Sequence, residues 1–218
     1  MKLVGFIGWS DSGKTTVIEG LVKELRGRGY RVGVLKHCPH GFDWDKKGTD
    51  SARIWAAGAQ GVALVGPDQV AFLERVAEVN LKQIAELYFP DYDFVLIEGG
   101  KEAVGFKKIM VTKEELPQDL PVSSGELLAV ISNEPLHIDK PVFRFDQLIE
   151  LADFLSQRED LERPAVVLSI EGRPLPLKPF VQEILSGAVW GIVKKLKKLP
   201  ERPRWLRLYL KGDREGKS

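Results

Sequence analysis

The chain has 218 residues, a formal net charge of +1 and a hydrophobic fraction of 44%. That length suits one α/β domain with a modest appendage, or two small domains, and the near-zero charge argues against a general nucleic-acid binder. The single cysteine, Cys38, excludes an intrachain disulfide framework and fits a reducing compartment. Because no segment resembles a signal peptide or a membrane span, we expect a cytoplasmic protein that binds neither nucleic acid nor membrane.

The first 36 residues predict a strand–helix–strand unit. Residues 2–8 form a short apolar run that ends in glycine, which is typical of a buried strand. Residues 15–28 carry apolar side chains at helical spacing, and Gly29 then favours the end of that helix. Residues 31–36 again have the pattern of a strand. This order of elements implies a parallel sheet.

The middle of the chain continues to alternate between strands and helices. After a polar loop, the expected elements are a helix over 50–57, strands over 61–65 and 70–73, a helix over 80–88, strands over 92–97, 108–112 and 127–132, and a helix over 146–157. The pattern predicts an α/β fold, with a mostly parallel central sheet flanked by helices.

The composition changes near residues 157–164, where charged residues indicate a linker. We therefore expect a first domain over 1–160 and a small α+β appendage over 164–212. Its predicted elements are a strand over 165–170, a helix over 179–198 and a strand over 205–210. The helix has apolar residues at amphipathic spacing, which we expect to be buried on one side: Phe180, Val181, Ile184, Leu185, Ala188, Ile192 and Leu196.

Two further features of this helix leave its role open. Gly187 and Gly191 would permit close packing on another helix or a second subunit. The lysines at its end complement the helix dipole or dock to an acidic partner or an anionic cofactor: Lys194, Lys195, Lys197 and Lys198.

A phosphate-binding motif lies between the first strand and the first helix. The sequence GWSDSGKT, from Gly8 to Thr15, matches G-x-x-x-x-G-K-[ST] without a mismatch. Its glycines let the backbone approach phosphate oxygens, and the start of the helix adds a positive dipole end. Lys14 is expected to neutralise the β- and γ-phosphates and to be the catalytic charge, while Thr15 is expected to bind Mg²⁺. The candidate phosphate-binding residues are Gly8, Trp9, Ser10, Asp11, Ser12, Gly13, Lys14, Thr15 and Thr16. Together with the α/β pattern, the motif predicts a P-loop NTPase fold in which residues 1–160 form the nucleotide-binding domain.

A second acidic anchor for Mg²⁺ is predicted at the end of a later strand. Residues 92–97 are mostly apolar and are followed by Glu98, as in the acidic strand end of P-loop proteins. Magnesium prefers hard oxygen ligands and keeps several waters, so Glu98 would bind the ion directly or through water. Gly99 and Gly100 would allow close approach of the backbone.

The loop after the second strand is the densest polar stretch of the chain. Lys36, His37 and His40 are candidates to face phosphate or a pterin, because ligands bind at the carboxyl ends of parallel strands. His37, Cys38 and His40 could alternatively hold a soft metal, although zinc usually takes four ligands. Asp50 and Asp45 are further candidates for Mg²⁺, and Asp50 also suits a helix start.

Three segments together resemble the molybdopterin-guanine dinucleotide biosynthesis protein B family. They are GWSDSGKTT, KHCPHGFDWDKKGTDSARIWAAGA and DFVLIEGGK, of which the middle one is the most specific. The family usually has lysine at the position of Thr49. The resemblance covers residues 1–157.

The resemblance implies a dimeric GTP-binding protein that uses Mg²⁺ and hydrolyses GTP slowly. It would assist a molybdopterin guanylyltransferase, the partner enzyme that joins GMP to molybdopterin in molybdenum cofactor biosynthesis. The choice of guanine rests on the resemblance, with Lys113 and Asn133 as candidates to contact the base. Two alternatives stay open: a nickel- or zinc-type metallochaperone, and a non-hydrolysing adapter that holds nucleotide or molybdopterin.

Overall fold

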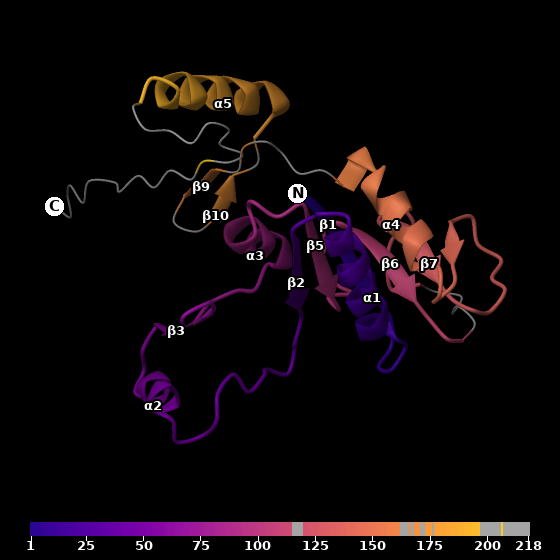
Figure 1. Ribbon diagram of the computed structural model, residues 1–218, viewed down its shortest axis with the longest axis horizontal. Helices are drawn as coiled ribbons and strands as arrows, with labels where there is room; N and C mark the ends of the chain where they lie inside the picture. Colours follow the sequence, from indigo (N-terminus) through magenta and orange to yellow (C-terminus); the bar gives the residue numbers. More distant parts are fainter. Residues whose placement is uncertain are drawn as a thin grey trace.

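The computed structural model describes residues 1–114, 120–161, 166, 168–170, 173–175, 177–196 and 206. Its first part contains the elements β1 (Lys2–Ile7), α1 (Lys14–Gly27), β2 (Val32–Lys36), α2 (Asp50–Ala56), β3 (Gly61–Val65), β4 (Val70–Glu74) and α3 (Leu81–Tyr88). They are followed by β5 (Phe94–Glu98), β6 (Lys107–Val111), β7 (Leu127–Ile131), β8 (Val142–Phe143), α4 (Leu148–Ser156) and a 3-10 turn over Glu159–Leu161. Figure 1 shows their arrangement.

A six-stranded sheet with the order β2-β5-β1-β6-β7-β8 forms the centre of the fold. Every pair of neighbouring strands in this sheet is parallel, so all the strands end at the same edge. The predicted α/β fold with a mostly parallel central sheet is thereby confirmed. The phosphate loop after β1 and the acidic end of β5 lie at this shared edge, because β1 and β5 are neighbours.

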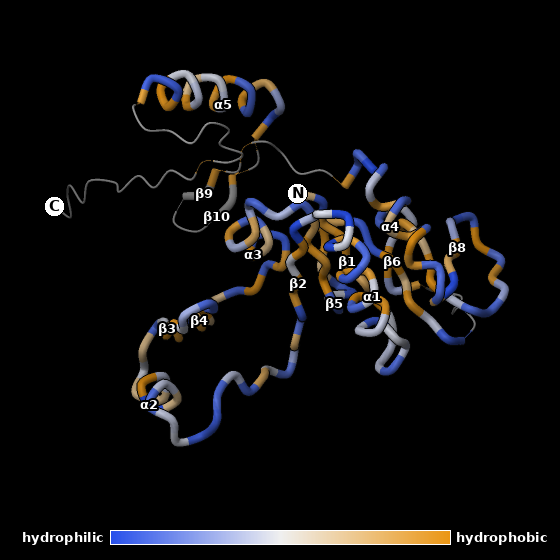
Figure 2. Tube along the Cα trace, in the orientation of Figure 1, coloured by the Kyte–Doolittle hydropathy of each residue, from blue (hydrophilic) through white to orange (hydrophobic). Residues whose placement is uncertain are grey.

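Helices cover both faces of the sheet. On one face, α1 and α4 bury apolar side chains against alternate residues of β1, β5 and β6. On the other face, α3 buries Leu81 and Ala85 against residues such as Leu3, Val95 and Ile97. Figure 2 shows the strands as mostly hydrophobic and the surrounding loops as mostly hydrophilic. This two-sided burial explains why the central strands are almost continuously apolar.

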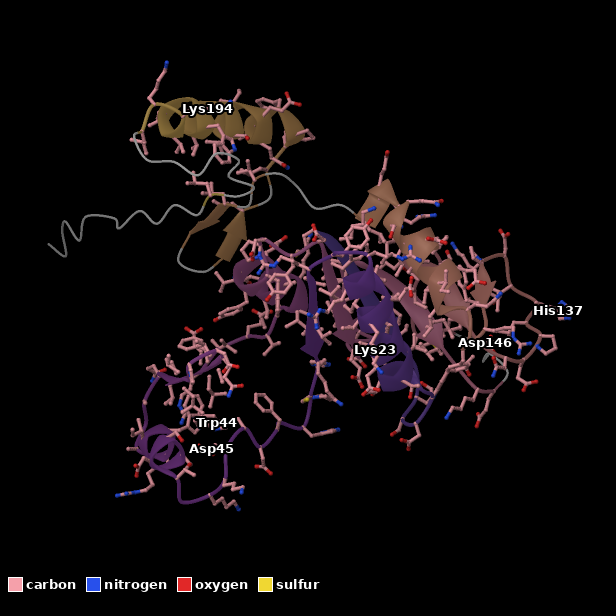
Figure 3. The ribbon with its side chains drawn as sticks, in the orientation of Figure 1. Lys23, Trp44, Asp45, His137, Asp146 and Lys194 are labelled. Carbon is pink, nitrogen blue, oxygen red and sulfur yellow. The ribbon has the colours of Figure 1, made fainter. Side chains whose placement is uncertain are left out.

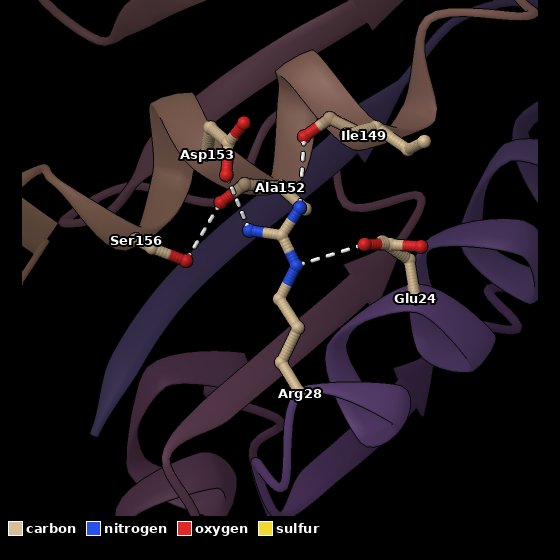
Figure 4. A network of polar contacts seen from close by, with 6 residues as sticks. All are labelled: Glu24, Arg28, Ile149, Ala152, Asp153 and Ser156. Atoms are coloured by element: carbon tan, nitrogen blue, oxygen red, sulfur yellow. Dashed lines mark hydrogen bonds and ion pairs between the residues drawn. The ribbon is translucent and has the colours of Figure 1, made fainter.

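A polar network joins the end of α1 to α4. Arg28 donates to Glu24 Oε1 at 2.8 Å, to Asp153 Oδ1 and to the carbonyl oxygen of Ile149 at 3.2 Å (Figure 4). The hydrogen bonds with Glu24 and then with Asp153 raise the pKa of the Arg28 guanidinium. The network fixes α1, which carries the phosphate loop at its other end, against the neighbouring helix.

The segment between β2 and α3, residues 37–80, projects away from the sheet in Figure 1, and we call it the arm. It contains α2 and the antiparallel pair β3–β4. Thr49 caps the start of α2, because its side chain accepts a hydrogen bond from the backbone N–H of Ala52. Several apolar side chains of the arm are exposed, including Ile54, Val65, Val70, Phe72, Val76 and Val79.

The C-terminal elements are β9 (Leu168–Ile170), β10 (Arg173–Leu175) and α5 (Pro179–Val193), and they lie apart from the central sheet in Figure 1. The antiparallel pairing of β9 with β10 was not predicted, because Pro174 argues against a strand. The predicted strand over 205–210 and the lysines at 197 and 198 fall outside the described residues, apart from Leu206. The division into domains at residue 160 stays a prediction.

The predicted burial of one side of α5 is wrong for five of its apolar residues, among them the exposed Ala188. Phe180, Ile184, Ile192 and Leu196 are exposed by 58%, 64%, 69% and 59%. Helical spacing identifies a common face, but it does not say whether another surface covers that face. Over the residues that the structure describes, none of the helices combines the length and the apolar character that crossing a membrane requires.

Candidate nucleotide site

The phosphate loop runs from the end of β1 to the start of α1, as the motif predicts. Gly8 follows the last residue of β1, and Gly13 directly precedes the helix with a φ of 97°. Asp11, between them, has a φ of 58°. Trp9, Ser10 and Asp11 are exposed, whereas Ser12 is buried. The loop therefore bends tightly over the carboxyl edge of the sheet.

Glycine is required at two positions of this loop. A Cβ atom at Gly8 would lie 2.2 Å from the carbonyl oxygen of Val111, at the end of β6. A Cβ atom at Gly13 would lie 2.8 Å from the ring of Phe145, and the positive φ of Gly13 is itself unfavourable for other residues. The neighbouring segments thus fix the path of the loop, and with it the backbone N–H groups that would face phosphate.

The ammonium group of Lys14 lies over the loop. It donates to the carbonyl oxygen of Gly8 at 3.1 Å, to that of Trp9, and to Ser12 Oγ at 3.4 Å. Partial burial lowers the pKa of Lys14, while the charges of Glu98 and Asp11 act in the opposite direction. A partly desolvated cation beside a helix N-terminus is suited to phosphate oxygens.

The two residues predicted to serve Mg²⁺ at the sheet edge are in direct contact. Thr15 in the first turn of α1 donates a hydrogen bond of 2.8 Å from Oγ1 to Glu98 Oε1. The same carboxylate oxygen lies 3.5 Å from Lys36 Nζ at the end of β2. Glu98 therefore joins three elements beside the phosphate loop. Hydroxyl and carboxylate oxygens are hard ligands, so the pair fits Mg²⁺. Thr16 follows in the same helical turn and is exposed.

The start of the polar loop lies next to this site. The backbone N–H of His37 donates to the carbonyl oxygen of Glu98 at 2.9 Å, which extends the β2–β5 pairing by one residue. Cys38 follows, and its thiol is 3.9 Å from the carbonyl oxygen of Lys36. His40 is exposed further along the loop. Within the described ranges, no group of three or more histidine, cysteine, aspartate or glutamate side chains is arranged to hold a metal ion.

The structure does not bring Asp45 and Asp50 together with Thr15 and Glu98. Figure 3 shows Asp45 beside α2 in the arm, away from α1. Asp45 accepts hydrogen bonds from the hydroxyls of Ser51 and Thr49 and from the backbone N–H of Lys46, and these bonds lower the pKa of its carboxyl group. The Asp50 side chain is 93% exposed at the start of α2 and lies 3.5 Å from Arg53.

Three further residues lie at or near the loop, and one of them was not indicated by the sequence. Lys113 Nζ donates to the carbonyl oxygen of Asp11 at 2.9 Å, so the lysine proposed for the base contacts the loop backbone. Asn133 Oδ1 accepts from the backbone N–H of Phe145 at 3.3 Å, and Phe145 lies against Gly13. Sequence position after a strand indicated Lys113 and Asn133. No motif indicated Phe145, which comes near the loop only through the pairing of β8 with β7.

Comparison with known proteins places this chain in a family. The profile of "Molybdopterin guanine dinucleotide synthesis protein B" (MobB) matches residues 3–133. A protein of Haemophilus influenzae named "Molybdopterin-guanine dinucleotide biosynthesis adapter protein" is 37% identical over 157 residues, covering 71% of this chain and 88% of that protein. A "Putative molybdopterin-guanine dinucleotide biosynthesis adapter protein" of Methanocaldococcus jannaschii is 27% identical over 221 residues, covering 90% and 92%.

Solved structures give the same result for the fold. "Crystal Structure of molybdopterin-guanine biosynthesis protein B (mobB)" is 33% identical with a TM-score of 0.55, covering 71% of this chain and 96% of that chain. "The Crystal structure of Bacillus subtilis MobB" is 28% identical with a TM-score of 0.58, covering 72% and 98%.

Proposed function

Since the chain belongs to the molybdopterin guanine dinucleotide synthesis protein B (MobB) family, we propose that it is a cytoplasmic, GTP- and Mg²⁺-binding adapter in molybdenum cofactor biosynthesis. It assists a molybdopterin guanylyltransferase in attaching GMP to molybdopterin. The observation that carries the proposal is the contact of Thr15 with Glu98 beside a complete phosphate loop. Both pieces are needed to hold a nucleoside triphosphate with its metal ion.

Each residue of the site has a definite task in this proposal. The N–H groups between Gly8 and Thr16 bind phosphate oxygens, and Lys14 neutralises the charge of the terminal phosphates. Thr15 and Glu98 hold Mg²⁺, directly or through water. Any hydrolysis of GTP by this chain is slow and depends on positioning and on charge stabilisation by Lys14, the metal ion and the backbone N–H groups.

The end of β2 is proposed to face the second substrate. Lys36 and His37 adjoin Glu98, and His40 follows in the same loop. Molybdopterin carries a phosphate and a polar heterocycle, which a lysine and two imidazoles can bind through charge-assisted hydrogen bonds. The adapter would then hold the two reactants of the guanylyltransferase near each other.

A homodimer is proposed on the basis of the arm. Its apolar side chains, such as Val65 at 77% exposed and Phe72 at 55% exposed, form part of a surface that a second protein can cover. This proposal is independent of nucleotide binding. Light scattering of the intact chain and of Phe72→Asp tests it, and a monomer at working concentration, or an oligomeric state that Phe72→Asp leaves unchanged, would contradict it.

Calorimetric titration with GTP and with ATP in the presence of Mg²⁺ tests the central proposal. We expect selective binding of GTP that is lost in Lys14→Ala. Lys47→Ala, which removes an exposed lysine of the arm, is the matched control and retains binding. A preference for ATP, or equal binding by wild type and Lys14→Ala, would overturn the assignment of guanine or of the phosphate loop.

In a second candidate function, the adapter acts by holding GTP or molybdopterin and does not need to hydrolyse GTP. The word "adapter" in the names of the relatives favours it. Adding a non-hydrolysable GTP analogue to the chain with its guanylyltransferase distinguishes the two. Full stimulation of the guanylyltransferase activity with the analogue assigns the function of this chain to GTP binding alone. Stimulation with GTP only would mean that this chain must hydrolyse GTP.

A further inference from the structure

Helix α5 carries a continuous exposed apolar ridge. Five residues spaced four apart in the sequence, Phe180, Ile184, Ala188, Ile192 and Leu196, are all exposed, and we call them the α5 ridge. The helix itself ends at Val193. Leu196 stays on the turn because backbone N–H groups of residues 195 and 196 donate to the carbonyl oxygens three residues earlier. Rows of residues four apart are the ridges that most often interlock when two helices pack.

The side chains of the ridge are small at its centre and large at its ends. Ala188 lies in the middle, and the exposed Gly187 and Gly191 beside it have nothing within 4 Å of the position where a Cβ atom would stand. Two helices that cross at an angle are closest at the crossing point and diverge on both sides. Small residues at the centre let the axes approach, and large residues at the ends fill the widening gap.

The ridge is also nearly the same when read in either direction. From Ala188 outward it has isoleucine at 184 and 192, then phenylalanine at 180 and leucine at 196. A twofold interface needs such a pattern, because each residue i that contacts residue j of the second copy is itself the j of the reverse contact. We propose that α5 pairs antiparallel with α5 of a second copy of this chain, with the twofold axis passing by Ala188.

Charge supports this direction of pairing. In an antiparallel pair centred on Ala188, the exposed Glu183 of one copy lies at nearly the same level along the helix axis as Lys194 and Lys195 of the other, so charges of opposite sign share each end of the pair. In a parallel pair, the lysines of the two copies would lie together and repel each other. Over residues 179–193 of the helix, Glu183 is the single charged residue, so the seam itself is apolar.

The pairing of α5 is separate from the family's shared core. The match to the Haemophilus influenzae protein covers 71% of this chain, whereas the match to the Methanocaldococcus jannaschii protein covers 90%. Because residues 1–161 are about three-quarters of the chain, the longer match includes residues after 161. The C-terminal segment is therefore an addition to the core, and its pairing does not depend on nucleotide binding or on the dimer proposed for the arm.

Disulfide cross-linking in a Cys38→Ser background tests the geometry. Cys38 is the single cysteine of the chain, so each introduced thiol reports on its own position. Ala188→Cys is expected to form a covalent dimer on mild oxidation, because the two copies of this residue meet at the axis. Lys195→Cys is the matched control on the same helix. Its two copies would lie roughly 20 Å apart at a rise of about 1.5 Å per residue, so it stays unlinked.

A mixing experiment fixes the direction. Ile184→Cys and Ile192→Cys, one turn from the axis, are each expected to give no covalent dimer alone, and to give a mixed dimer when the two proteins are combined. Self-linking of Ile184→Cys or Ile192→Cys at the rate of Ala188→Cys would overturn the antiparallel arrangement. GTP titration of the same variants keeps this result separate from the proposed function, because a variant can bind GTP normally and still fail to cross-link.

Absence of cross-linking in Ala188→Cys would overturn pairing through α5, even if light scattering finds a dimer formed elsewhere. Co-sedimentation with vesicles of phosphatidylcholine and phosphatidylserine is measured in parallel on the Cys38→Ser protein and on the same protein with Ile184→Asp. Binding that Ile184→Asp abolishes would assign the ridge to a lipid surface and would overturn the proposal. We expect no such binding.

Discussion

Thr15 Oγ1 donates a 2.8 Å hydrogen bond to Glu98 Oε1 and thereby joins the first turn of α1 to the carboxyl end of β5. The contact exists because β1 and β5 are parallel neighbours, with Phe6 paired to Glu98 in register. A residue of the phosphate loop's helix and an acid 83 positions later are placed together by the sheet. The predictions for metal-dependent binding start from this pair.

Glu98→Gln is expected to weaken GTP binding in the presence of Mg²⁺ by about tenfold or more, the equivalent of one charged interaction of roughly 1.5–3 kcal/mol. Calorimetry with and without Mg²⁺ checks this, and the loss should disappear when the metal ion is chelated. Thr15→Ser keeps the hydroxyl and should bind nearly as wild type, whereas Thr15→Ala should resemble Glu98→Gln. An equal loss with and without Mg²⁺ would contradict a metal role.

GTP affinity is expected to fall as the pH rises from neutral through the pKa of Lys14. Burial lowers this pKa, so the ammonium is lost at a less alkaline pH than for an ordinary lysine. Phosphate binds the protonated form better, so affinity is full below the lowered pKa and declines above it. Titrations across the alkaline range measure the decline. Lys14→Arg keeps its charge and should give a flatter profile, and equally steep profiles would contradict the assignment.

Substitution by alanine should change the free energy of unfolding in opposite directions at two glycines of α1. A Cβ atom at Gly20 would lie 2.3 Å from Leu148 Cδ1 of α4, so Gly20→Ala must displace this methyl group and should lower the free energy of unfolding by up to about 1 kcal/mol after the helix-propensity gain. A Cβ atom at Gly27 would have nothing within 4 Å, so Gly27→Ala should raise the free energy of unfolding by about 0.5–1 kcal/mol. Urea denaturation of wild type and of both variants measures the two changes in the free energy of unfolding. Stabilisation by Gly20→Ala would show that α1 and α4 are not packed closely there.

Asp45→Asn is expected to disturb the start of α2 and to leave Mg²⁺-dependent GTP binding unchanged. Asp45 accepts bonds from Ser51, Thr49 and Lys46, so its carboxylate is already engaged within the arm. Because its folded pKa is lowered, the stability it contributes is present above its unfolded pKa and is lost as the pH falls through the folded pKa. Limited proteolysis of the arm with an acid-stable protease, from the ordinary aspartate pKa of about 3.9 downward, compares wild type with Asp45→Asn, and the difference between the two should vanish at the lowest pH. Loss of metal-dependent binding in Asp45→Asn would restore Asp45 as a magnesium ligand.

The sequence predicted the central sheet and the phosphate site for the same reason. Continuous apolar strands and a fixed motif are local patterns, and the carboxyl ends of parallel strands always share one edge. The two-residue β8 is too short to give a pattern, and β10 was not predicted because it contains Pro174, which disfavours a strand. Phe145 could not be predicted beside Gly13, because its position depends on how β8 pairs with β7.

The sequence was less informative about which surfaces are covered. The spacing of Phe180, Ile184, Ile192 and Leu196 correctly grouped them on one side of α5, but the structure leaves that side exposed. Likewise, Asp45 and Asp50 were grouped with the metal site because they follow β2, although the arm carries them away from the sheet. Residue periodicity describes a single element, whereas exposure depends on the elements that surround it.

The central position of β1 determines when the site can form during synthesis. Lys2 pairs with Phe94, and Val4 pairs with Lys107, so the first strand finds both of its neighbours only after roughly half the chain exists. The phosphate motif is synthesised before β5 and β6, so the strands that position it are made later. A nascent chain that ends before β6 therefore carries the motif without the fold, and nucleotide can stabilise the protein only after synthesis has passed that strand.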